Sequence, residues 1–194
     1  MSTEIIRSPE LLHRASSRLL IVDVQVKLAG MLAELAREQL ISSCQFLGDA
    51  AKLLGIPLSI TEQYPKGLGD TVTALQPYCA DRPAKKRFSC VECLGWPSAA
   101  EAADDRFQIV VAGMETHVCI LQTVLDLLSA GYQVYVVVDA VASQRLIDQQ
   151  IAVERMANSG AILVTAEGVV FEWAETAEAA EFKQLSALVK GRGI

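Results

Sequence analysis

The chain has no uninterrupted apolar run of the ~18 residues that a transmembrane helix needs, so we expect no membrane partner. Positive charge is scarce, because 17 Lys and Arg face 23 Asp and Glu and leave a net charge of −6. Nucleic-acid surfaces need clustered basic residues, and the densest cluster is only Lys85-Lys86-Arg87, so no nucleic-acid partner is expected. The start of the chain lacks the apolar segment of a secretory signal and carries acidic residues, which predicts a cytoplasmic protein.

Histidine is scarce as well, and His13 and His117 show no metal-site spacing. The five cysteines are an odd number, which favours free thiols in a chain without an export signal. Cys44 falls on the apolar stripe of a predicted helix and is interpreted as a core residue. The C-x-x-C at 90–93 could be a redox pair or half a zinc site, but an isolated pair is weak support for either. We expect neither a metal nor a cofactor.

The sequence also lacks repeats, low-complexity tracts and linkers. Its 194 residues are 52% hydrophobic and 21% charged, which is typical of a globular protein with a sizeable core. We therefore predict one domain over 1–194, with 1–16 as an N-terminal extension.

Apolar segments of strand length alternate with amphipathic segments of helix length. The predicted strands are 19–22, 57–61, 85–89, 107–112, 133–138 and 161–164. The predicted helices are 36–54, 98–105, 144–159 and 176–189, with Gly55 ending the first and Ser143 capping the helix at 144–159. A further helix is predicted after the fourth strand, with Ile120, Val124, Leu127 and Leu128 on one side and Gly131 as its stop. Residues 62–83 are predicted to be mostly loop. Alternation of this kind indicates an α/β fold, a three-layer αβα arrangement around a six-stranded, mainly parallel, doubly wound sheet.

In such sheets the functional groups lie beyond the carboxyl ends of the strands. Asp23 follows the first strand, Glu62 and its loop follow the second, and the turn at 113–119 follows the fourth. We expect these three positions to meet in one crevice.

Cys119 lies in the first turn of the helix that follows the fourth strand. The positive end of a helix dipole and unpaired N–H groups favour a thiolate there, so Cys119 is a candidate nucleophile. The alternative is that Cys119 is simply a small buried residue, because free cysteines are often buried.

Asp23 comes directly after four apolar residues, where a carboxylate needs a partner. It could serve as a general base for the cysteine, or it could cap a following helix. Lys85 or Lys86 could supply a cation that stabilises both anions, although a solvated surface pair is the alternative. His117 is interpreted as a satisfied local group.

Three motifs in this order resemble the isochorismatase-like cysteine hydrolases, a family that includes nicotinamidases. They are LIVDVQ at 20–25, KKRFS at 85–89 and GMETHVC at 113–119. The segment TEQYPKGLG at 61–69, together with ETHVC at 115–119, is similar to the branch of isochorismatase domain-containing proteins. The resemblance covers nearly the whole chain from residue 19 onward.

The resemblance implies a role for each matching residue. Asp23 would be the general base and acid, Lys85 rather than Lys86 the family's lysine, and Cys119 the nucleophile. Family members also have a non-proline cis peptide that corresponds to Met114–Glu115. The backbone N–H groups of Glu115 and Cys119 would then bind a developing oxyanion.

The sequence departs from metal-dependent nicotinamidases, which carry Asp-x-His and a further His after the second strand. Here 62–66 reads EQYPK, so no metal is expected and nicotinamide is a weaker candidate substrate. The resulting hypothesis is a metal-free hydrolase of a small amide or related carbonyl compound, acting through a Cys-Asp-Lys triad and a thioester. Alternatives are vinyl-ether hydrolysis of the isochorismatase type without covalent catalysis, and a binding or assembly domain with a vestigial site.

Gln25, Tyr64, Phe88 and Trp96 are candidates for the walls of a substrate pocket, although the aromatic residues could equally be core or oligomer contacts. The apolar, aromatic segment VVFEW at 169–173 suggests a subunit interface. We therefore expect a homo-oligomer, a dimer or a tetramer.

Overall fold

Six parallel strands form a single sheet in a computed structural model of the chain, which describes residues 7–192. In spatial order the strands are β3 (Ala84–Lys85), β2 (Leu58–Gln63), β1 (Ser17–Val22), β4 (Gln108–Met114), β5 (Gln133–Ala142) and β6 (Ile162–Val164). Each neighbouring pair is parallel, which confirms the predicted doubly wound α/β sheet. Within the described range, no helix has both the length and the apolar character to cross a membrane.

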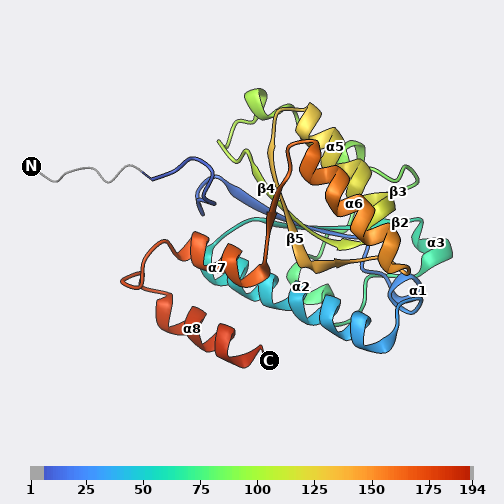
Figure 1. Ribbon diagram of the computed structural model, residues 1–194, viewed down its shortest axis with the longest axis horizontal. Helices are drawn as coiled ribbons and strands as arrows, with labels where there is room; N and C mark the ends of the chain where they lie inside the picture. The colour runs from blue at the N-terminus through green and yellow to red at the C-terminus, as the bar shows by residue number, and fades with distance from the viewer. Residues whose placement is uncertain (1–6, 193–194) are drawn as a thin grey trace, which may run out of the picture.

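Helices cover both faces of the sheet. They are α1 (Val26–Ala29), α2 (Glu34–Leu54), α3 (Pro65–Leu68), α4 (Val91–Leu94), α5 (Leu121–Ser129), α6 (Leu146–Asn158), α7 (Ala166–Ala174) and α8 (Phe182–Gly191). Figure 1 shows α5 and α6 on one face, and α2, α7 and α8 on the other. The short helices α1 and α3 lie together at the end of the sheet where β1 and β2 finish. The three-layer arrangement leaves the carboxyl ends of the strands available for a site.

The central strand β1 shows why the sheet is buried on both faces. Leu19 and Ile21 belong to the hydrophobic cluster under α2 and α7, whereas Leu20 and Val22 belong to the cluster under α5 and α6. All four side chains are fully buried. Burying side chains of this size stabilises the fold by about 1.5–3 kcal/mol each.

Helix α2 follows its predicted apolar stripe closely. Leu40, Cys44 and Leu47 are buried against the sheet, which confirms Cys44 as a core residue, and Gly55 ends the helix in the left-handed conformation with φ 68°. Ala36 was predicted on the same stripe but is exposed. The first turn of α2 extends beyond the edge of the core, so apolar spacing alone places that residue wrongly.

Two predicted elements are much shorter than expected. The strand predicted at 85–89 is only β3, because the chain turns back and directs the carbonyl of Phe88 at the Lys85 ammonium. The helix predicted at 98–105 is a single 3-10 turn, η2 (Ala99–Glu101), whose first residues are held by a hydrogen bond from the Ser98 hydroxyl to Glu101.

The C-terminal part of the chain also differs from its prediction. Helix α6 begins at Leu146 without a side-chain cap, because the hydroxyl of Ser143 contacts His117 Nδ1 instead. The last helix starts at Phe182 rather than 176. Helix α7 was not predicted at all, and the Thr165 hydroxyl caps it by accepting the N–H of Gly168.

Helix α7 corrects part of the interface predicted at 169–173. Val169, Val170 and Trp173 are fully buried in the core of their own chain, so they cannot contact a second subunit, whereas Phe171 is 42% exposed. An apolar, aromatic segment has the same composition in a core as in an interface, which is why the sequence alone does not separate these residues.

The described part of the predicted N-terminal extension, 7–16, packs against this helix, while 1–6 lies outside the described residues. Arg7 donates to the backbone carbonyl of Glu172 at 2.7 Å, and the Glu172 carboxylate accepts the N–H of Leu12 at 2.8 Å. Leu12 is fully buried. These contacts tie residues 7–16 to α7.

Candidate active site

Asp23 follows β1, in the middle of the sheet, and its side chain is fully buried. Its Oδ1 accepts a hydrogen bond from the Thr61 hydroxyl at 2.8 Å, and its Oδ2 accepts one from the Lys85 ammonium at 2.6 Å. Its backbone has a φ of 51°, a region that non-glycine residues rarely occupy. Helix α1 begins only at Val26 and has no side-chain cap, so the helix-cap interpretation of Asp23 is wrong.

Lys85 is buried, and its ammonium has three strong acceptors. They are Asp23 Oδ2 at 2.6 Å, Gln63 Oε1 at 2.7 Å and the Phe88 carbonyl at 2.8 Å. An ammonium has three protons, so each is used in one of these bonds and Lys85 can act on further groups only through its charge. Its neighbour Lys86 is exposed, so the solvated alternative holds for Lys86 and is wrong for Lys85.

Electrostatics hold Lys85 in its charged form. Burial by itself lowers the pKa of Lys85, but the charge of Asp23 raises it, with further contributions from Cys90 and Cys119, and the net shift is upward. A buried ion pair of this kind is stable only when both partners keep their hydrogen bonds. The pair therefore forms a fixed charged unit at the end of β1.

The turn after β4 brings Cys119 to the same place. Gly113 pairs with Val22 in the sheet and has a φ of 118°, and a Cβ at this position would overlap the backbone of Val22. Glycine thus lets β4 approach the end of β1 closely. The peptide bond between Met114 and Glu115 is cis, and Cys119 follows in a π-helical turn, η3 (Thr116–Ile120), that leads into α5. Turns of this type often occur at functional sites.

Cys119 is not a resting thiolate. Burial raises the pKa of the Cys119 thiol, the negative charge of Asp23 and a hydrogen bond with it raise the pKa further, and the charge of Lys85 lowers it, so that the net shift is upward. The sequence-based expectation that a helix start favours the thiolate is therefore wrong here. The sulfur belongs to a π turn and packs in the hydrophobic cluster under α5, and its burial is the largest cause of the raised pKa.

The three predicted positions at the carboxyl ends of the strands converge only in part. Asp23 and Cys119 meet, whereas Glu62 faces the other way: its carboxylate accepts the Thr71 hydroxyl at 2.7 Å and pairs with Arg82 at 3.2 Å. Successive side chains of a strand point to opposite faces of the sheet. Its neighbours in β2, Thr61 and Gln63, therefore reach the site instead.

Three residues of the site were missed in the sequence. Thr61 donates to Asp23, and Gln63 accepts from Lys85. The sulfur of the buried Cys90 lies 3.3 Å from the Thr61 hydroxyl oxygen. Strand alternation could have identified Thr61, because it is the last residue of the predicted second strand. Gln63 lies opposite Lys85 in the register of β2 and β3, and no sequence pattern indicates that pairing.

Of the four predicted pocket residues, Gln25 and Trp96 lie elsewhere. Gln25 is fully buried, and its amide donates to the Gln63 and Gly69 carbonyls and accepts the Gln63 N–H, which gives it a structural role. Trp96 packs near Tyr132 with ring centroids 6.3 Å apart, and the Arg18 guanidinium lies 5.2 Å from its ring. Arg18 and Tyr132 are at the amino ends of β1 and β5, so Trp96 lies at the amino ends of the strands, opposite to the candidate site.

Tyr64 and Phe88, the other two predicted pocket residues, lie near Lys85 and are half exposed. Tyr64 lines a hollow of about 450 Å³ together with Lys66, Lys85 and Lys86. A second hollow, of about 340 Å³, adjoins Lys85 from the side of Arg87 and Cys93. Phe88 lines neither hollow; its side chain is half exposed and its carbonyl accepts a hydrogen bond from Lys85. Small-molecule binding next to Lys85 is therefore sterically feasible.

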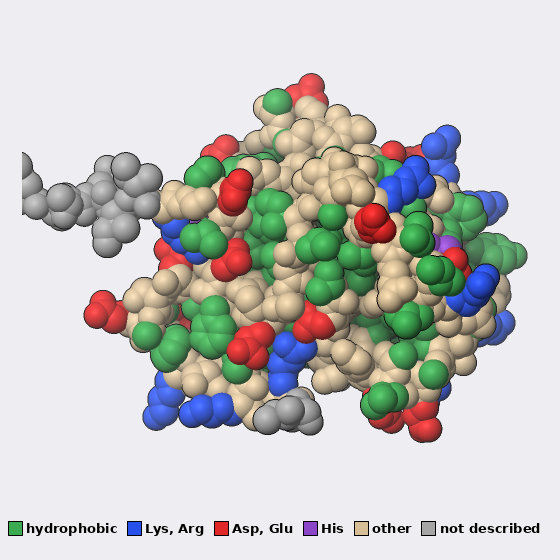
Figure 2. Space-filling view, viewed as in Figure 1, with side chains coloured by type: hydrophobic (Ala, Val, Ile, Leu, Met, Phe, Trp, Pro, Cys, Tyr) green, Lys and Arg blue, Asp and Glu red, His purple; other side chains and the backbone are tan. Residues whose placement is uncertain are grey.

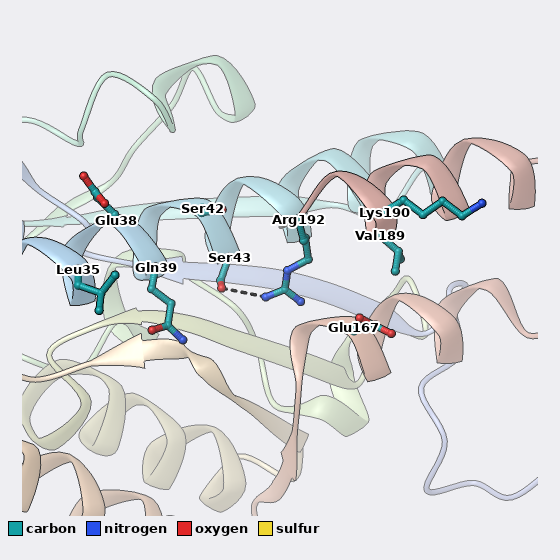
Figure 3. Close-up of a pocket in the computed structure, with 9 residues that line it drawn as sticks. All are labelled: Leu35, Glu38, Gln39, Ser42, Ser43, Glu167, Val189, Lys190 and Arg192. Carbon is teal, nitrogen blue, oxygen red and sulfur yellow. Dashed lines mark hydrogen bonds between the residues drawn. The ribbon is translucent and has the colours of Figure 1, made fainter. Parts of the chain in front are cut away.

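A larger hollow, of about 830 Å³, lies away from Lys85. Figure 3 shows it between α2, α7 and α8, where Arg192 reaches across to the Ser43 hydroxyl. Its lining residues are Leu35, Glu38, Gln39, Ser42, Ser43, Glu167, Val189, Lys190 and Arg192. None of them is a thiol or a histidine, and the hollow lies over a face of the sheet rather than at the carboxyl ends of its strands.

The remaining cysteines and histidines do not form a metal centre in the described part of the chain, where no group of three or more suitable side chains gathers. All five cysteines are free. Cys90 and Cys93 are joined by a hydrogen bond from the Cys93 thiol to the Cys90 carbonyl, 3.2 Å long. His117 Nδ1 contacts the Ser143 hydroxyl at 3.0 Å, which confirms His117 as a locally satisfied group.

Comparisons with known proteins place this arrangement in context. A family model described as the isochorismatase domain matches residues 17–168. Isochorismatase domain-containing protein 2 from Bos taurus is 39% identical over 183 residues, which cover 90% of this chain and 83% of that protein.

Two solved structures share the fold. The MAR1 ribonuclease from Caenorhabditis elegans superposes with a TM-score of 0.82 and 35% identity, covering 93% of this chain and 92% of that one. The YcaC gene product from Escherichia coli, described as an octameric hydrolase of unknown specificity, superposes with a TM-score of 0.80 and 24% identity, covering 94% and 92%.

Proposed function

This chain belongs to the isochorismatase family, and from that premise we propose that it is a metal-free cysteine hydrolase of a small amide or related carbonyl compound. The observation that carries the proposal is the buried ion pair of Asp23 and Lys85, 2.6 Å apart, beside the thiol of Cys119. In this proposal Cys119 is the nucleophile, Asp23 the general base and acid, and Lys85 the cation that stabilises both.

The raised pKa of Cys119 decides how the first step runs. The thiol is protonated at rest, so it is activated only during attack, when the S–H proton passes to the Asp23 carboxylate. The sulfur bonds to the carbonyl carbon, and the carbonyl π electrons move to the oxygen. The backbone N–H groups of Glu115 and Cys119 would bind this oxyanion. In support, the Glu115 N–H donates to no acceptor among the described residues.

The later steps return Asp23 and Cys119 to their starting protonation states, with the first proton leaving on the amine and its replacement coming from water. As the tetrahedral adduct collapses, the C–N bond breaks and the Asp23 carboxyl proton goes to the leaving amine, which leaves a thioester on Cys119. Water then adds to the thioester carbonyl and gives a proton to Asp23. When the second adduct collapses, the C–S bond breaks and the sulfur recovers that proton. Lys85 keeps its three hydrogen bonds throughout and acts by charge alone.

Turnover of a panel of small amides by the wild type and by Cys119→Ala tests this function. We expect at least one amide to be hydrolysed, and Cys119→Ala to lose about 10³-fold or more in kcat/KM. The matched control is Cys79→Ser, which removes a half-buried thiol that donates to the Asp81 carbonyl. This variant should keep wild-type activity. Equal turnover by Cys119→Ala and the wild type would exclude Cys119 from the chemistry, and no turnover of any amide by the wild type would favour vinyl-ether hydrolysis or a binding domain.

A second candidate is hydrolysis of RNA, favoured by the 35% identity to the protein described as a ribonuclease. The hollows beside Lys85 carry the exposed cations Lys66, Lys86 and Arg87, which could contact phosphates. The net charge of −6 counts against an extended nucleic-acid surface. Incubation of the same variants with a short single-stranded RNA separates the candidates, since only a ribonuclease would cleave it in a Cys119- or Asp23-dependent manner.

The proposal also includes a homo-oligomer, as described for the Escherichia coli structure. The apolar residues Leu35, Leu146, Ile147 and Ile151 are half or more exposed. They lie on α6 and at the start of α2, and Figure 2 shows hydrophobic side chains reaching the surface over that part of the molecule. Exposed apolar patches of this kind mark interaction sites.

Light scattering after size exclusion tests the assembly. We expect the wild type to be larger than a monomer, and a double variant Leu146→Glu, Ile151→Glu to shift to monomer. Leu11→Glu, at an exposed apolar residue outside this patch, is the control and should assemble normally. A monomeric wild type would exclude the interface.

A further inference from the structure

The Asp23 carboxylate is held from two sides by different groups. Lys85 binds Oδ2, and the hydroxyl of Thr61 binds Oδ1 at 2.8 Å. Thr61 is itself fully buried and contacts the sulfur of Cys90 at 3.3 Å. The mechanism proposed above uses neither Thr61 nor Cys90, although both lie at its centre.

Proton counting fixes the direction of these hydrogen bonds. A carboxylate paired with an ammonium can only accept, so the single hydroxyl proton of Thr61 goes to Asp23. That leaves a lone pair of the Thr61 oxygen facing Cys90, and the 3.3 Å contact must therefore be a hydrogen bond from the Cys90 S–H. The order of donation is Cys90 to Thr61 to Asp23.

This order separates the two sulfurs near Asp23 by role. Burial and the charge of Asp23 raise the pKa of Cys90 to about 12, so Cys90 has its proton to donate at neutral pH. Its backbone N–H donates to the Thr123 hydroxyl at 2.9 Å, which fixes its position at the start of α4. Cys90 therefore reaches Asp23 only through the Thr61 hydroxyl, whereas Cys119 is hydrogen-bonded to Asp23 directly.

We propose that Thr61 and Cys90 are positioning residues for Asp23, with the Cys90 thiol orienting the Thr61 hydroxyl and that hydroxyl fixing the plane of the carboxylate that accepts the Cys119 proton. The inference rests on the proposed function for its catalytic consequence. The hydrogen-bond order itself does not depend on which substrate is hydrolysed.

Four variants test the two links. Thr61→Val removes the hydroxyl at constant shape, and Thr61→Ser retains it. Cys90→Ala removes the donor, and Cys90→Ser replaces it with another donor. The matched control is Thr71→Val, because Thr71 is also buried and its hydroxyl also donates to a carboxylate, that of Glu62, outside the site.

Amide turnover measures the catalytic consequence. Thr61→Val is expected to lower kcat by about 10- to 100-fold with KM nearly unchanged, the range for loss of a hydrogen bond to a charged group. Thr61→Ser should restore most of the rate. Cys90→Ala should lower kcat by about 2- to 10-fold, as for a bond between neutral groups, and Cys90→Ser should restore it.

Alkylation by iodoacetamide provides a readout that needs no substrate. Peptide mass spectrometry follows Cys119 and Cys90 separately from about pH 6 to about pH 10. The groups that face Cys119 are Asp23, Lys85 and Cys90. In Thr61→Val the Asp23 charge is no longer shared with a hydroxyl and should raise the pKa of Cys119 further. Cys119 should therefore be alkylated more slowly than in the wild type at each pH, whereas Thr71→Val and Thr61→Ser should keep the wild-type rate.

The outcomes distinguish this inference from the proposed function. If Thr61→Val keeps the wild-type kcat and the wild-type alkylation rate of Cys119, or merely loses thermal stability as Thr71→Val does, the positioning role is overturned. If Cys119→Ala still hydrolyses the amide, the proposed function fails, yet slower alkylation of Cys119 in Thr61→Val would still support the hydrogen bond from Thr61 to Asp23. Faster alkylation of Cys90 than of Cys119 in the wild type would overturn the assignment of the two sulfurs.

Discussion

The Lys85 ammonium lies 2.6 Å from Oδ2 of Asp23, although the two residues are 62 positions apart in the chain. Both side chains are almost completely removed from water. A buried pair contributes little net stability over a well-packed apolar pair, but removal of one partner leaves an uncompensated buried charge. The pair therefore couples the stability of the fold to the integrity of the site.

Lys85→Met is predicted to lower the free energy of unfolding by about 3–5 kcal/mol, because Asp23 is left buried and unpaired. Asp23→Asn together with Lys85→Met should recover much of this loss, since neither charge then remains. Urea denaturation of the single and double variants measures the coupling. A loss below about 1 kcal/mol for Lys85→Met would mean that the pair is far more solvated than the structure indicates.

Asp23→Asn is predicted to abolish amide turnover and yet to make Cys119 more reactive toward iodoacetamide at neutral pH. The charge of Asp23 raises the pKa of Cys119, so its removal lowers that pKa while Lys85 still attracts the thiolate. Each unit of decrease raises the thiolate fraction about tenfold. Cys44, whose pKa burial raises to about 12 in the core far from Asp23, is the internal control. Slower alkylation of Cys119 in the variant would contradict the prediction.

Glu62 is predicted to supply part of the acid dependence of stability. Burial raises its pKa, but hydrogen bonds from Thr71 and the ion pair with Arg82 lower it, and the net shift is downward. A carboxyl whose folded pKa is depressed contributes stability above its unfolded value of about 4.3, and that stability is lost as pH falls through the folded pKa. Glu62→Gln should therefore flatten the pH dependence of the urea midpoint below about pH 4. An unchanged slope would exclude this role.

Gly113→Ala is predicted to destabilise the protein by about 3–5 kcal/mol, since it combines an unfavourable φ of 118° with overlap on the Val22 backbone. Gly55→Ala is the matched control: its φ of 68° is also positive, but no atom lies within 4 Å of the added Cβ. It should cost only about 1 kcal/mol. Thermal melts of both variants make the comparison, and equal losses would show that backbone conformation alone matters at Gly113.

The sequence predicted the sheet well because its strands are apolar on both faces. The run at 19–22 was identified as a buried strand, and in the structure its side chains feed both hydrophobic clusters. Helix α7 was missed because it too is largely apolar, so it carries no amphipathic pattern to distinguish it from a strand or an interface. Composition identifies burial here, but it cannot say what covers a buried segment.

The sequence predicted the principal residues of the candidate site but missed Thr61, Gln63 and Cys90, which contact them. Asp23, Lys85 and Cys119 could be named from motifs, and the carboxyl-end rule brings Asp23 and Cys119 together. Glu62 was assigned to the wrong side because it was taken as the start of a loop, whereas β2 continues to Gln63 and strand alternation turns Glu62 to the face opposite Thr61. The raised pKa of Cys119 was missed because desolvation depends on the packed surroundings of the sulfur.

The most direct test of a covalent hydrolase centred on Cys119 is trapping of the acyl-enzyme. The wild type is mixed with a hydrolysable amide or its more reactive ester, quenched in acid during turnover, and digested for peptide mass spectrometry. The account predicts that the peptide containing Cys119 gains the mass of the acyl group, that hydroxylamine removes it, and that Cys119→Ala shows neither the adduct nor turnover. Steady turnover with no adduct on Cys119, retained in Cys119→Ala, would contradict it.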